Sequence, residues 1–380
     1  MIYLDNSATS YPKPRCVIDS IHEIISKYGA NSGRGSYKMA IDTTEQIYLS
    51  RKKVADFFNM SDPEKVIFTY NCTTALNMAI KGIAKSGSHF IISDFEHNAV
   101  VRPLEALKQK GICDYTVARV ENDVYKTLRN FEKCINKNTV AIICTGASNV
   151  FGIIPPYKAL ASLAHKHNLL FILDYSQIAG IIPLDLRNKN IDIVCCSGHK
   201  GLMGLSGVGL LLLNNELPLN TIIEGGTGSN SESLLQPDEF PDRFESGTPN
   251  IVGIIALSRS MDFLNKMKSE NIYNHEIKLL KHLQYNLEKN KKIRLYTDLF
   301  DNRRKCAPIL SFNVENMHSE EVADRLSKDN IAVRAGLHCA PLAHKSMSTL
   351  NTGAVRISPS IFTEKNHIDF LINSLRKFAK

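Results

Sequence analysis

The sequence predicts an α/β protein in which a larger part with a mostly parallel sheet precedes a smaller α+β C-terminal domain. Two observations support this prediction. Between residues 60 and 215, short apolar runs rich in Ile and Val alternate with amphipathic stretches, a pattern typical of parallel strands joined by helices. After about residue 250, longer helical patterns surround single short strands.

The first part contains apolar runs that are short enough for strands and apolar enough to be buried on both faces. These predicted strands are residues 65–70, 89–93, 139–146, 169–174, 191–197 and 208–213. Predicted helices follow the first three, over 73–84, 99–111 and 156–168. Ligands of such sheets bind beyond the carboxyl ends of the strands, so the residues after each strand are the ones to inspect.

The second part begins after a loop, residues 225–250, that is rich in Gly, Ser and Pro and long enough to indicate a functional role or disorder. The predicted helices are residues 251–268, 273–290, 319–330 and 364–380, and the predicted strands are 307–314 and 353–359. This mixture of helices and strands indicates the smaller α+β domain.

The composition excludes several classes of protein. The chain of 380 residues is 43% hydrophobic and 22% charged, which is ordinary for a soluble globular protein. Its N-terminus lacks the pattern of a secretory signal, and no apolar run approaches the roughly 18 residues that span a bilayer. The basic residues behind the net charge of +8 are scattered, so we expect a cytoplasmic protein with neither a membrane nor a nucleic-acid partner.

The nine cysteines form no C-x-x-C pair and no regular spacing, so we expect neither a disulfide framework nor a metal site. Cys144, Cys195 and Cys196 fall in predicted strands and are expected to be reduced core residues. Cys339 differs, because "RAGLHCAPLAHK" (334–345) is too polar and too rich in turn signals to be core. It is the candidate for a working thiol.

Polar residues follow two of the predicted strands in a way that suits an anionic, planar ligand. Thr73 and Thr74 open the helix after 65–70, where hydroxyls and free N–H groups suit a phosphate, although a threonine there could simply cap the helix. Asp174 ends the strand 169–174, where a buried carboxylate needs a partner such as a cationic ring nitrogen. A capping aspartate is the alternative.

Two further strand ends carry candidate reactive groups. Lys200 lies in a glycine-rich loop after 191–197, with Ser197 and His199 beside it as further phosphate donors. Partial desolvation there would lower the pKa of the amine and make it nucleophilic, although most lysines are exposed and unreactive. His97, after 89–93, could stack on a planar cofactor or merely cap the next helix.

All these groups fall at one edge of one predicted sheet. Pyridoxal 5'-phosphate (PLP) requires a lysine for covalent attachment, a carboxylate at its ring nitrogen and donors around its phosphate. No G-x-G-x-x-G, Walker A or G-x-S-x-G pattern competes with this interpretation. The sequence therefore predicts a PLP-dependent enzyme.

Several motifs resemble the class V aminotransferase-fold enzymes, and among them the NifS-like cysteine desulfurases of the SufS-like group, which includes selenocysteine lyases. They are "YLDNSAT", "EHNAVVRP", "SNVFGIIPP", "LDYSQIAG", "SGHKGLMG", "FESGTPN" and "RAGLHCAP". The resemblance spans nearly the whole chain and implies a PLP-dependent transferase of fold type I. It implies an N-terminal arm (1–15) that packs on the small domain, a large PLP-binding domain (16–250) and a small domain (251–380).

The resemblance also implies roles for single residues. Lys200 would hold PLP covalently, Asp174 would pair with the ring nitrogen, and Gln177 would bond the phenolic oxygen. His97 would stack on the ring and assist proton transfer, and Asn149 would lie near the substrate or ring. The phosphate ligands would be Thr73, Thr74, Ser197, His199 and, from the other subunit of a homodimer, Thr248.

The implied reaction converts L-cysteine to L-alanine. Arg356, with Arg334 in the same region, would clamp the substrate carboxylate. Cys339, as a thiolate, would take the sulfur as a persulfide for iron–sulfur cluster or thio-cofactor biosynthesis, with a sulfur-acceptor protein as partner. One departure from the family is Cys72, which stands where Gly usually precedes the paired threonines and alters the fine geometry of the phosphate loop.

Three alternatives remain open at this point. The first is a selenocysteine lyase, which would act on L-selenocysteine with Cys339 as a selectivity device. The second is another class V PLP enzyme, an aminotransferase or C–S lyase, with Cys339 incidental. The third is a non-catalytic sulfur-carrier partner.

Overall fold

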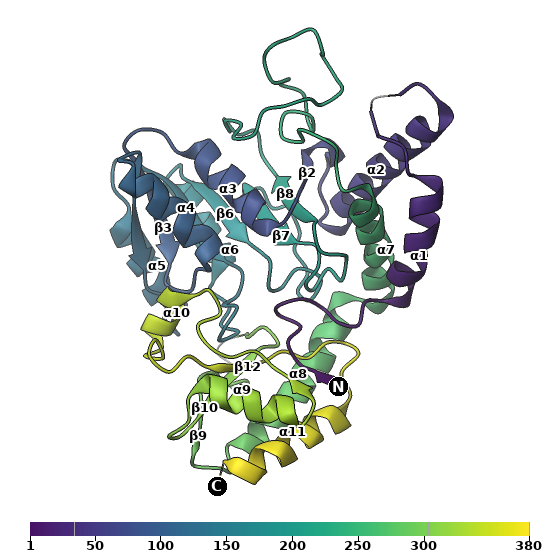
Figure 1. The fold of residues 1–380 in the computed structure, drawn as a ribbon. Coiled ribbons are helices and arrows are strands. Elements are labelled where there is room, and N and C mark those ends of the chain that lie inside the picture. Colours follow the sequence, from purple (N-terminus) through teal and green to yellow (C-terminus); the bar gives the residue numbers. More distant parts are fainter. Residues whose placement is uncertain (34, 302–304, 380) are drawn as a thin grey trace.

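The computed structural model describes residues 1–33, 35–301 and 305–379, and a seven-stranded sheet forms its centre (Figure 1). The strand order is β2-β8-β7-β6-β5-β3-β4. The strands are β2 (Val66–Thr69), β3 (Ser88–Ser93), β4 (Cys113–Ala118), β5 (Thr139–Thr145), β6 (Leu170–Asp174), β7 (Ile193–Ser197) and β8 (Gly209–Leu213). All six strands predicted for this part of the chain are confirmed, and β4 is an addition at the sheet edge.

The predicted α/β class is confirmed, because the sheet is parallel except at β8. The pairs β3–β4, β3–β5, β5–β6 and β6–β7 are parallel, whereas β8 runs antiparallel to both β7 and β2. Consequently β2, β3, β5, β6 and β7 all place their carboxyl ends at one edge of the sheet, which we call the carboxyl edge.

Helices cover both faces of this sheet (Figure 1). One face packs against α3 (Cys72–Ile83) and α4 (Asn98–Gln109). The other face packs against α2 (Lys38–Phe57), α5 (Val124–Cys134), α6 (Tyr157–Lys166) and α7 (Ile251–Met267), and α1 (Arg15–Lys27) packs on α7. The sequence prediction included α3, α4, α6 and α7 but not α1, α2 or α5.

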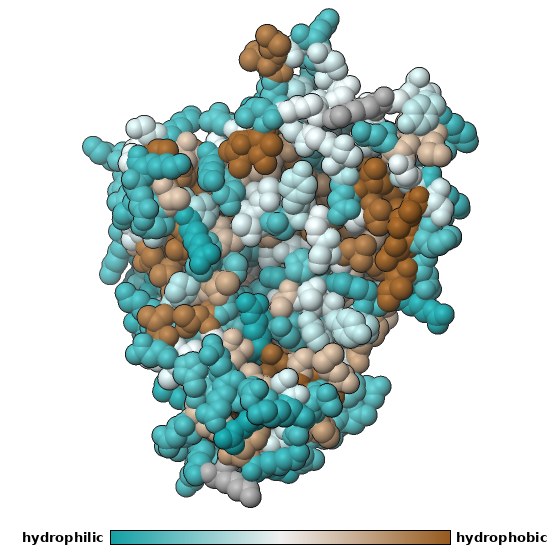
Figure 2. Space-filling model, in the orientation of Figure 1, coloured by the Kyte–Doolittle hydropathy of each residue, from teal (hydrophilic) through white to brown (hydrophobic). Residues whose placement is uncertain are grey.

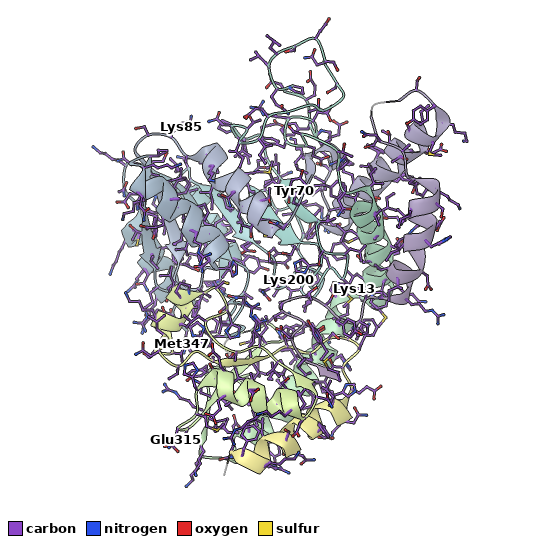
Figure 3. All side chains as sticks on the ribbon, viewed as in Figure 1. Lys13, Tyr70, Lys85, Lys200, Glu315 and Met347 are labelled. Atoms are coloured by element: carbon purple, nitrogen blue, oxygen red, sulfur yellow. The ribbon has the colours of Figure 1, made fainter. Side chains whose placement is uncertain are left out.

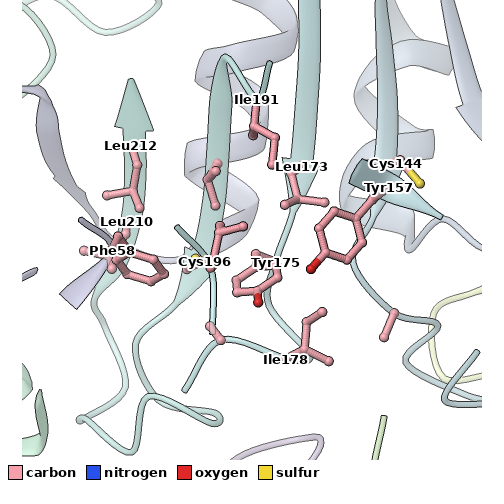
Figure 4. Close-up of a cluster of buried hydrophobic side chains, with 14 of the residues drawn as sticks. Phe58, Cys144, Tyr157, Leu173, Tyr175, Ile178, Ile191, Cys196, Leu210 and Leu212 are labelled. Carbon is pink, nitrogen blue, oxygen red and sulfur yellow. The ribbon is translucent and has the colours of Figure 1, made fainter. Parts of the chain in front are cut away.

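Two of the cysteines in the predicted strands lie in the core on the second face (Figure 4). Cys144 and Cys196 are fully buried there beside Tyr157 and Tyr175. Both are free thiols. Burial raises the pKa of the Cys144 and Cys196 thiols well above the ordinary value, so these two are unreactive core side chains.

The C-terminal part contains two small sheets. One is antiparallel, in the order β12-β10-β9, and the other pairs β1 with β11 in parallel. Its elements are β9 (Ile293–Leu295), β10 (Leu310–Val314), β11 (Ile331–Ala332), β12 (Val355–Ile357), α8 (Ser269–Leu287), α9 (Ser319–Lys328), α10 (Pro341–Ser346) and α11 (Lys365–Phe378), and β1 is Ile2–Tyr3. The predicted elements are all present, except that residue 380 of the last helix lies outside the described residues.

The N-terminal residues join the two parts. β1 pairs with β11, while α7 packs on α1 and α2 rather than on the small sheets. The division of the chain at residues 15 and 250 stays a prediction. In the described part of the chain, no helix is long and apolar enough to cross a membrane.

Candidate active site

A cavity of about 150 Å³ opens at the carboxyl edge of the central sheet, around Lys200 (Figure 3). Its walls come from loops that follow five of the strands, which is where a mostly parallel sheet binds its ligands. The predicted site residues that line it are Thr73, His97, Asn149, Asp174, Gln177, Ser197, His199 and Lys200, and the other lining residues are Asn71, Cys72, Ala99, Thr145 and Ser176.

Lys200 is fixed by a tight turn after β7. Met203 N donates to the Lys200 carbonyl at 2.8 Å. Gly201 next to it packs so closely on the Ala179 carbonyl that no side chain would fit. Burial lowers the pKa of the Lys200 amine, and no described side chain forms an ion pair or hydrogen bond with it. The amine is therefore available to react.

Asp174, the last residue of β6, is a buried carboxylate without a cationic partner among the described residues. It is 6% exposed, and its Oδ1 accepts from Ser176 N at 3.0 Å and from Cys72 Sγ at 3.7 Å. Two such donors leave part of the negative charge uncompensated. A protonated ring nitrogen in the cavity would supply the missing partner.

The start of α3 forms an anion site beside the same cavity. The helix is capped by Asn71, whose Oδ1 accepts from Thr74 N at 2.9 Å, so neither threonine is the cap. Thr73, in the first turn, is exposed and lines the cavity. A helix N-terminus with a free hydroxyl suits a phosphate group.

His97 caps α4 and also lines the cavity. Its Nδ1 accepts from Ala99 N at 3.0 Å, so a neutral ring carries its proton on Nε2. Burial, with the charges of Lys200 and Arg334 as smaller causes, lowers the pKa of His97 to about 4. The ring is therefore neutral near pH 7, as stacking on a cationic cofactor ring requires.

Some buried polar atoms around the cavity lack partners within the described chain. Asn149 Oδ1 and His199 Nδ1 are both in this state. Such orphaned atoms are costly unless a ligand or water satisfies them. With the amine of Lys200, the carboxylate of Asp174 and the start of α3, they form the donor set that PLP needs, so the residues present fit this cofactor.

Arg356 lies next to the cavity rather than in its wall. The side chain is 1% exposed, with Nη1 donating to the Asn149 carbonyl at 2.7 Å and Nη2 to Asp5 Oδ1 at 2.6 Å. Its buried Nε has no partner. Arg334 pairs with it through the backbone, since Arg356 N donates to the Arg334 carbonyl at 2.8 Å.

Cys339 lies in a turn, residues 336–340, that we call the thiol turn. Gly336, His338 and Cys339 all have positive φ, of 97°, 50° and 56°. Such a shape is unfavourable for residues with side chains and needs external support. Asn149 Nδ2 donates to the His338 carbonyl at 2.7 Å, and the backbone N of Asn98 donates to the Cys339 carbonyl at 2.8 Å. The Cys339 side chain itself is exposed.

The structure thus brings most predicted site residues together and separates a few. Thr74 and Thr248 line a second pocket, between the loop 225–250 and α2. The cavity wall does not include Arg334, Arg356 or Cys339, which are linked to it through Asn149 and the start of α4. Sequence reasoning missed Asn71, Ser176 and Asp5, although Ser176 and Asp5 lie inside quoted motifs.

Comparisons with known proteins agree with this geometry. A family model described as "Aminotransferase class-V" matches residues 2–371. The "Probable cysteine desulfurase" of Methanothermobacter thermautotrophicus is 30% identical over 387 residues, covering 100% of this chain and 94% of that protein. The "Probable cysteine desulfurase" of Pyrococcus abyssi is 31% identical over 391 residues, with the same two coverages. A solved apo cysteine desulfurase from Thermococcus onnurineus NA1 matches with a TM-score of 0.92 and 29% identity, over 100% of this chain and 94% of that one.

Proposed function

We propose that this chain, which belongs to the aminotransferase class V family, is a PLP-dependent cysteine desulfurase. The reaction takes L-cysteine and the Cys339 thiol to L-alanine and a persulfide on Cys339. The observation that supports the proposal is a cavity lined by a buried amine, Lys200, and a carboxylate without a cationic partner, Asp174. The exposed Cys339 lies next to this cavity, in a turn that hydrogen bonds hold in place.

The cofactor contributes one property. When bound, PLP withdraws electrons from the α-carbon of an amino acid attached to it. In this chain, Lys200 would hold it covalently and the Asp174 carboxylate would keep the ring nitrogen protonated. Gln177 Nε2, which donates to the Ser7 carbonyl at 3.3 Å, lies in the cavity wall where it can contact the ring.

Proton transfer falls to Lys200 Nζ. Burial lowers its pKa and so favours the neutral amine, which is the form that can accept the proton from the α-carbon of the substrate. The neutral ring of His97, with its proton on Nε2, is the second group in the cavity able to move a proton. The two groups therefore share the acid–base work.

Substrate orientation falls to Arg356 and Asn149. The unpartnered Nε of Arg356 and the unpartnered Oδ1 of Asn149 are both buried next to the cavity. A guanidinium binds a carboxylate through charge-assisted hydrogen bonds, and the amide oxygen can accept from the substrate ammonium. Arg334 adds a second positive charge in the same region.

Cys339 completes the reaction. Its thiolate attacks the sulfur of the substrate, so that a new S–S bond forms while the carbon–sulfur bond of cysteine breaks. The electron pair of that bond stays with the three-carbon fragment, which takes up protons to become alanine. The exposure of Cys339 supports a further proposal, transfer of its sulfur to an acceptor protein for iron–sulfur cluster or thio-cofactor biosynthesis in the cytoplasm.

A homodimer is part of the same proposal. Thr248 is exposed and lies outside the Lys200 cavity of its own chain, so it is free to reach the phosphate in a second copy. Figure 2 shows apolar surface over the region of α1 and α7, and Ile18 and Ile25 of α1 are 52% and 59% exposed. Exposed apolar patches of this kind often mark protein interfaces. Analytical ultracentrifugation tests this point: a monomer would contradict it.

Two single variants test the activity itself. Cys339→Ala should bind PLP like the parent but lose alanine release from L-cysteine, because no thiolate remains to take the sulfur. Cys16→Ala is the matched control, since Cys16 is the other exposed cysteine and lies on α1 away from the cavity. If Cys339→Ala desulfurates cysteine as fast as the parent, the persulfide mechanism is wrong. If the parent prefers L-selenocysteine and Cys339→Ala keeps that activity, the protein is a selenocysteine lyase.

A further inference from the structure

The carbonyl of His199, the peptide oxygen directly before Lys200, accepts an unusual set of hydrogen bonds from a segment that we call the arm, residues 5–13. Lys13 Nζ lies 2.8 Å from this oxygen, Ser10 N 3.1 Å, and the hydroxyls of Thr9 and Ser10 3.2 Å each. A carbonyl oxygen has two lone pairs, so these four donors are more than the oxygen needs to be fully hydrogen-bonded. The arm therefore holds this peptide firmly.

Lys13 is the charged member of the set. Its ammonium also donates to Ser10 Oγ at 2.8 Å, and it makes no ion pair with any carboxylate of the described residues. Burial lowers the pKa of Lys13 to about 8, which reflects the cost of taking this charge partly out of water. A half-buried ammonium without an acidic partner is unusual, and the contact with the His199 carbonyl is its main compensation.

The other end of the arm is fixed near the substrate arginine. Asn6 Nδ2 donates to the Ser358 carbonyl at 3.0 Å, and Ser7 N donates to Ser358 Oγ at 2.9 Å. Asp5 accepts from Arg356 in the same stretch. The arm is thus a short tie between Arg356 and the peptide that carries Lys200, and Figure 3 places Lys13 and Lys200 at the centre of the molecule.

We propose that Lys13 is a positioning residue for the cofactor lysine. Its ammonium, with Thr9 and Ser10, holds the His199–Lys200 peptide on the side of the arm, and the next residue, Gly201, packs on the Ala179 carbonyl. The Lys200 side chain then extends into the cavity from a peptide that is held in place, and the His199 ring, whose buried Nδ1 has no partner in the described chain, stays in the cavity wall. This inference rests on the proposed function, because it assumes that Lys200 binds PLP.

The test measures cofactor binding without substrate. Lys13→Met keeps the length of the side chain but removes the charged donor, so the Kd for PLP should rise about tenfold, as expected for a lost charge-assisted hydrogen bond. The induced circular dichroism of the bound cofactor should weaken as well, because its orientation is less fixed. Lys13→Arg keeps a charged donor and should restore both properties to within about threefold of the parent.

Controls separate positioning from general stability. Lys27→Met removes an exposed lysine of α1 that forms an ion pair with Glu23, and it should leave the Kd and the dichroism unchanged. Urea unfolding of the apoproteins should give similar midpoints for the parent and for Lys13→Met. If the parent binds PLP through Lys200 but Lys13→Met binds it with the same Kd and dichroism, the inference is wrong. If the parent does not bind PLP through Lys200, the proposed function fails, and this inference fails with it.

Discussion

Asn149 contacts both the carboxyl edge of the sheet and the thiol turn, but different interactions hold the two regions in place. At the edge, Asp174 is the last residue of β6 and Lys200 follows the neighbouring strand β7, so the register of β6 and β7 sets their separation. In the thiol turn, Cys339 has a left-handed backbone and an exposed side chain, and two hydrogen bonds hold the turn, one from Asn149 after β5 and one from Asn98 at the start of α4. The residues of the cofactor cavity are thus placed by the register of the sheet, whereas Cys339 is placed by two hydrogen bonds from residues far away in the sequence.

The largest effect should come from breaking the edge itself. Lys200→Ala removes the amine that we propose binds the cofactor covalently and moves the substrate proton, so alanine release should fall by at least about 10³-fold. The absorption band of the lysine-bound cofactor should disappear together with the activity. Lys85→Ala, which changes an exposed lysine near β3, is the control and should behave like the parent. A Lys200→Ala enzyme that retains a tenth of the parent rate would contradict the assignment.

The next variant separates the two regions. Asn149→Ala deletes the 2.7 Å hydrogen bond to the His338 carbonyl, so the thiol turn loses one of its two supports. The rate of persulfide formation should fall at least about tenfold, because the variant leaves the His338 carbonyl unsatisfied and also loses the amide oxygen proposed to accept from the substrate ammonium. The absorption of the bound cofactor, measured without substrate, should change less, since Lys200 and Asp174 are untouched and only the Asn149 amide is lost from the cavity wall. Equal losses of cofactor binding and persulfide formation would show that the two regions are not separable.

Acid should destabilise both regions, because each buries a neutral histidine. Burial lowers the pKa of His97 to about 4 and that of His338 to about 2, both below the ordinary value of 6.5. The unfolded chain therefore binds more protons than the folded chain below about pH 6.5, and stability falls as the pH decreases. Urea unfolding of the apoprotein measures this loss, which is roughly 2 kcal/mol for each of the two histidines between pH 7 and pH 5 and is partly offset by Glu96.

At the carboxyl edge, Glu96 has the opposite effect on the pH dependence of stability. Its burial raises the carboxyl pKa from 4.5 to about 8, so its contribution to stability is present at low pH and is lost as the pH rises from about 4.5 through 8. Glu96→Gln should therefore steepen the loss of stability below pH 7, and His97→Asn should flatten it. Parallel pH profiles for the parent and both variants would contradict the assigned protonation states.

The smallest effect should follow from Cys72→Gly, which restores the residue usual in the family. The backbone at Cys72 is not in the left-handed region, so glycine is not required there. The substitution removes the weak 3.7 Å hydrogen bond from Sγ to Asp174, and a threefold change or less in the Kd for PLP is expected. A tenfold tighter Kd would mean that Cys72 obstructs the phosphate loop.

The strands and their ends were predictable because each is a local apolar run. Lys200, Asp174 and His97 could be assigned to one edge from the alternation alone, since parallel strands end together. β4 was not predicted because this edge strand is half-exposed and mixes Asp114 and Thr116 with apolar residues. Its sequence therefore lacks the apolar run that identified its neighbours.

Contacts between residues far apart in the sequence could not be predicted, for a different reason. The pair of Asp5 and Arg356 joins residues at opposite ends of the chain, and nothing in either local sequence requires it. The left-handed backbone of Cys339 is likewise supported by hydrogen bonds from Asn149, which follows β5, and from Asn98, the first residue of α4. Likewise, the four donors on the His199 carbonyl appear only once the arm has folded onto it.

The most direct test of the account is the mass of the PLP-loaded protein after one equivalent of L-cysteine, followed by identification of the modified peptide. We expect one added sulfur atom on the peptide that contains Cys339, removable by a reducing agent and formed together with one equivalent of alanine. Alanine release with no sulfur on Cys339, or with sulfur on another cysteine, would contradict the account.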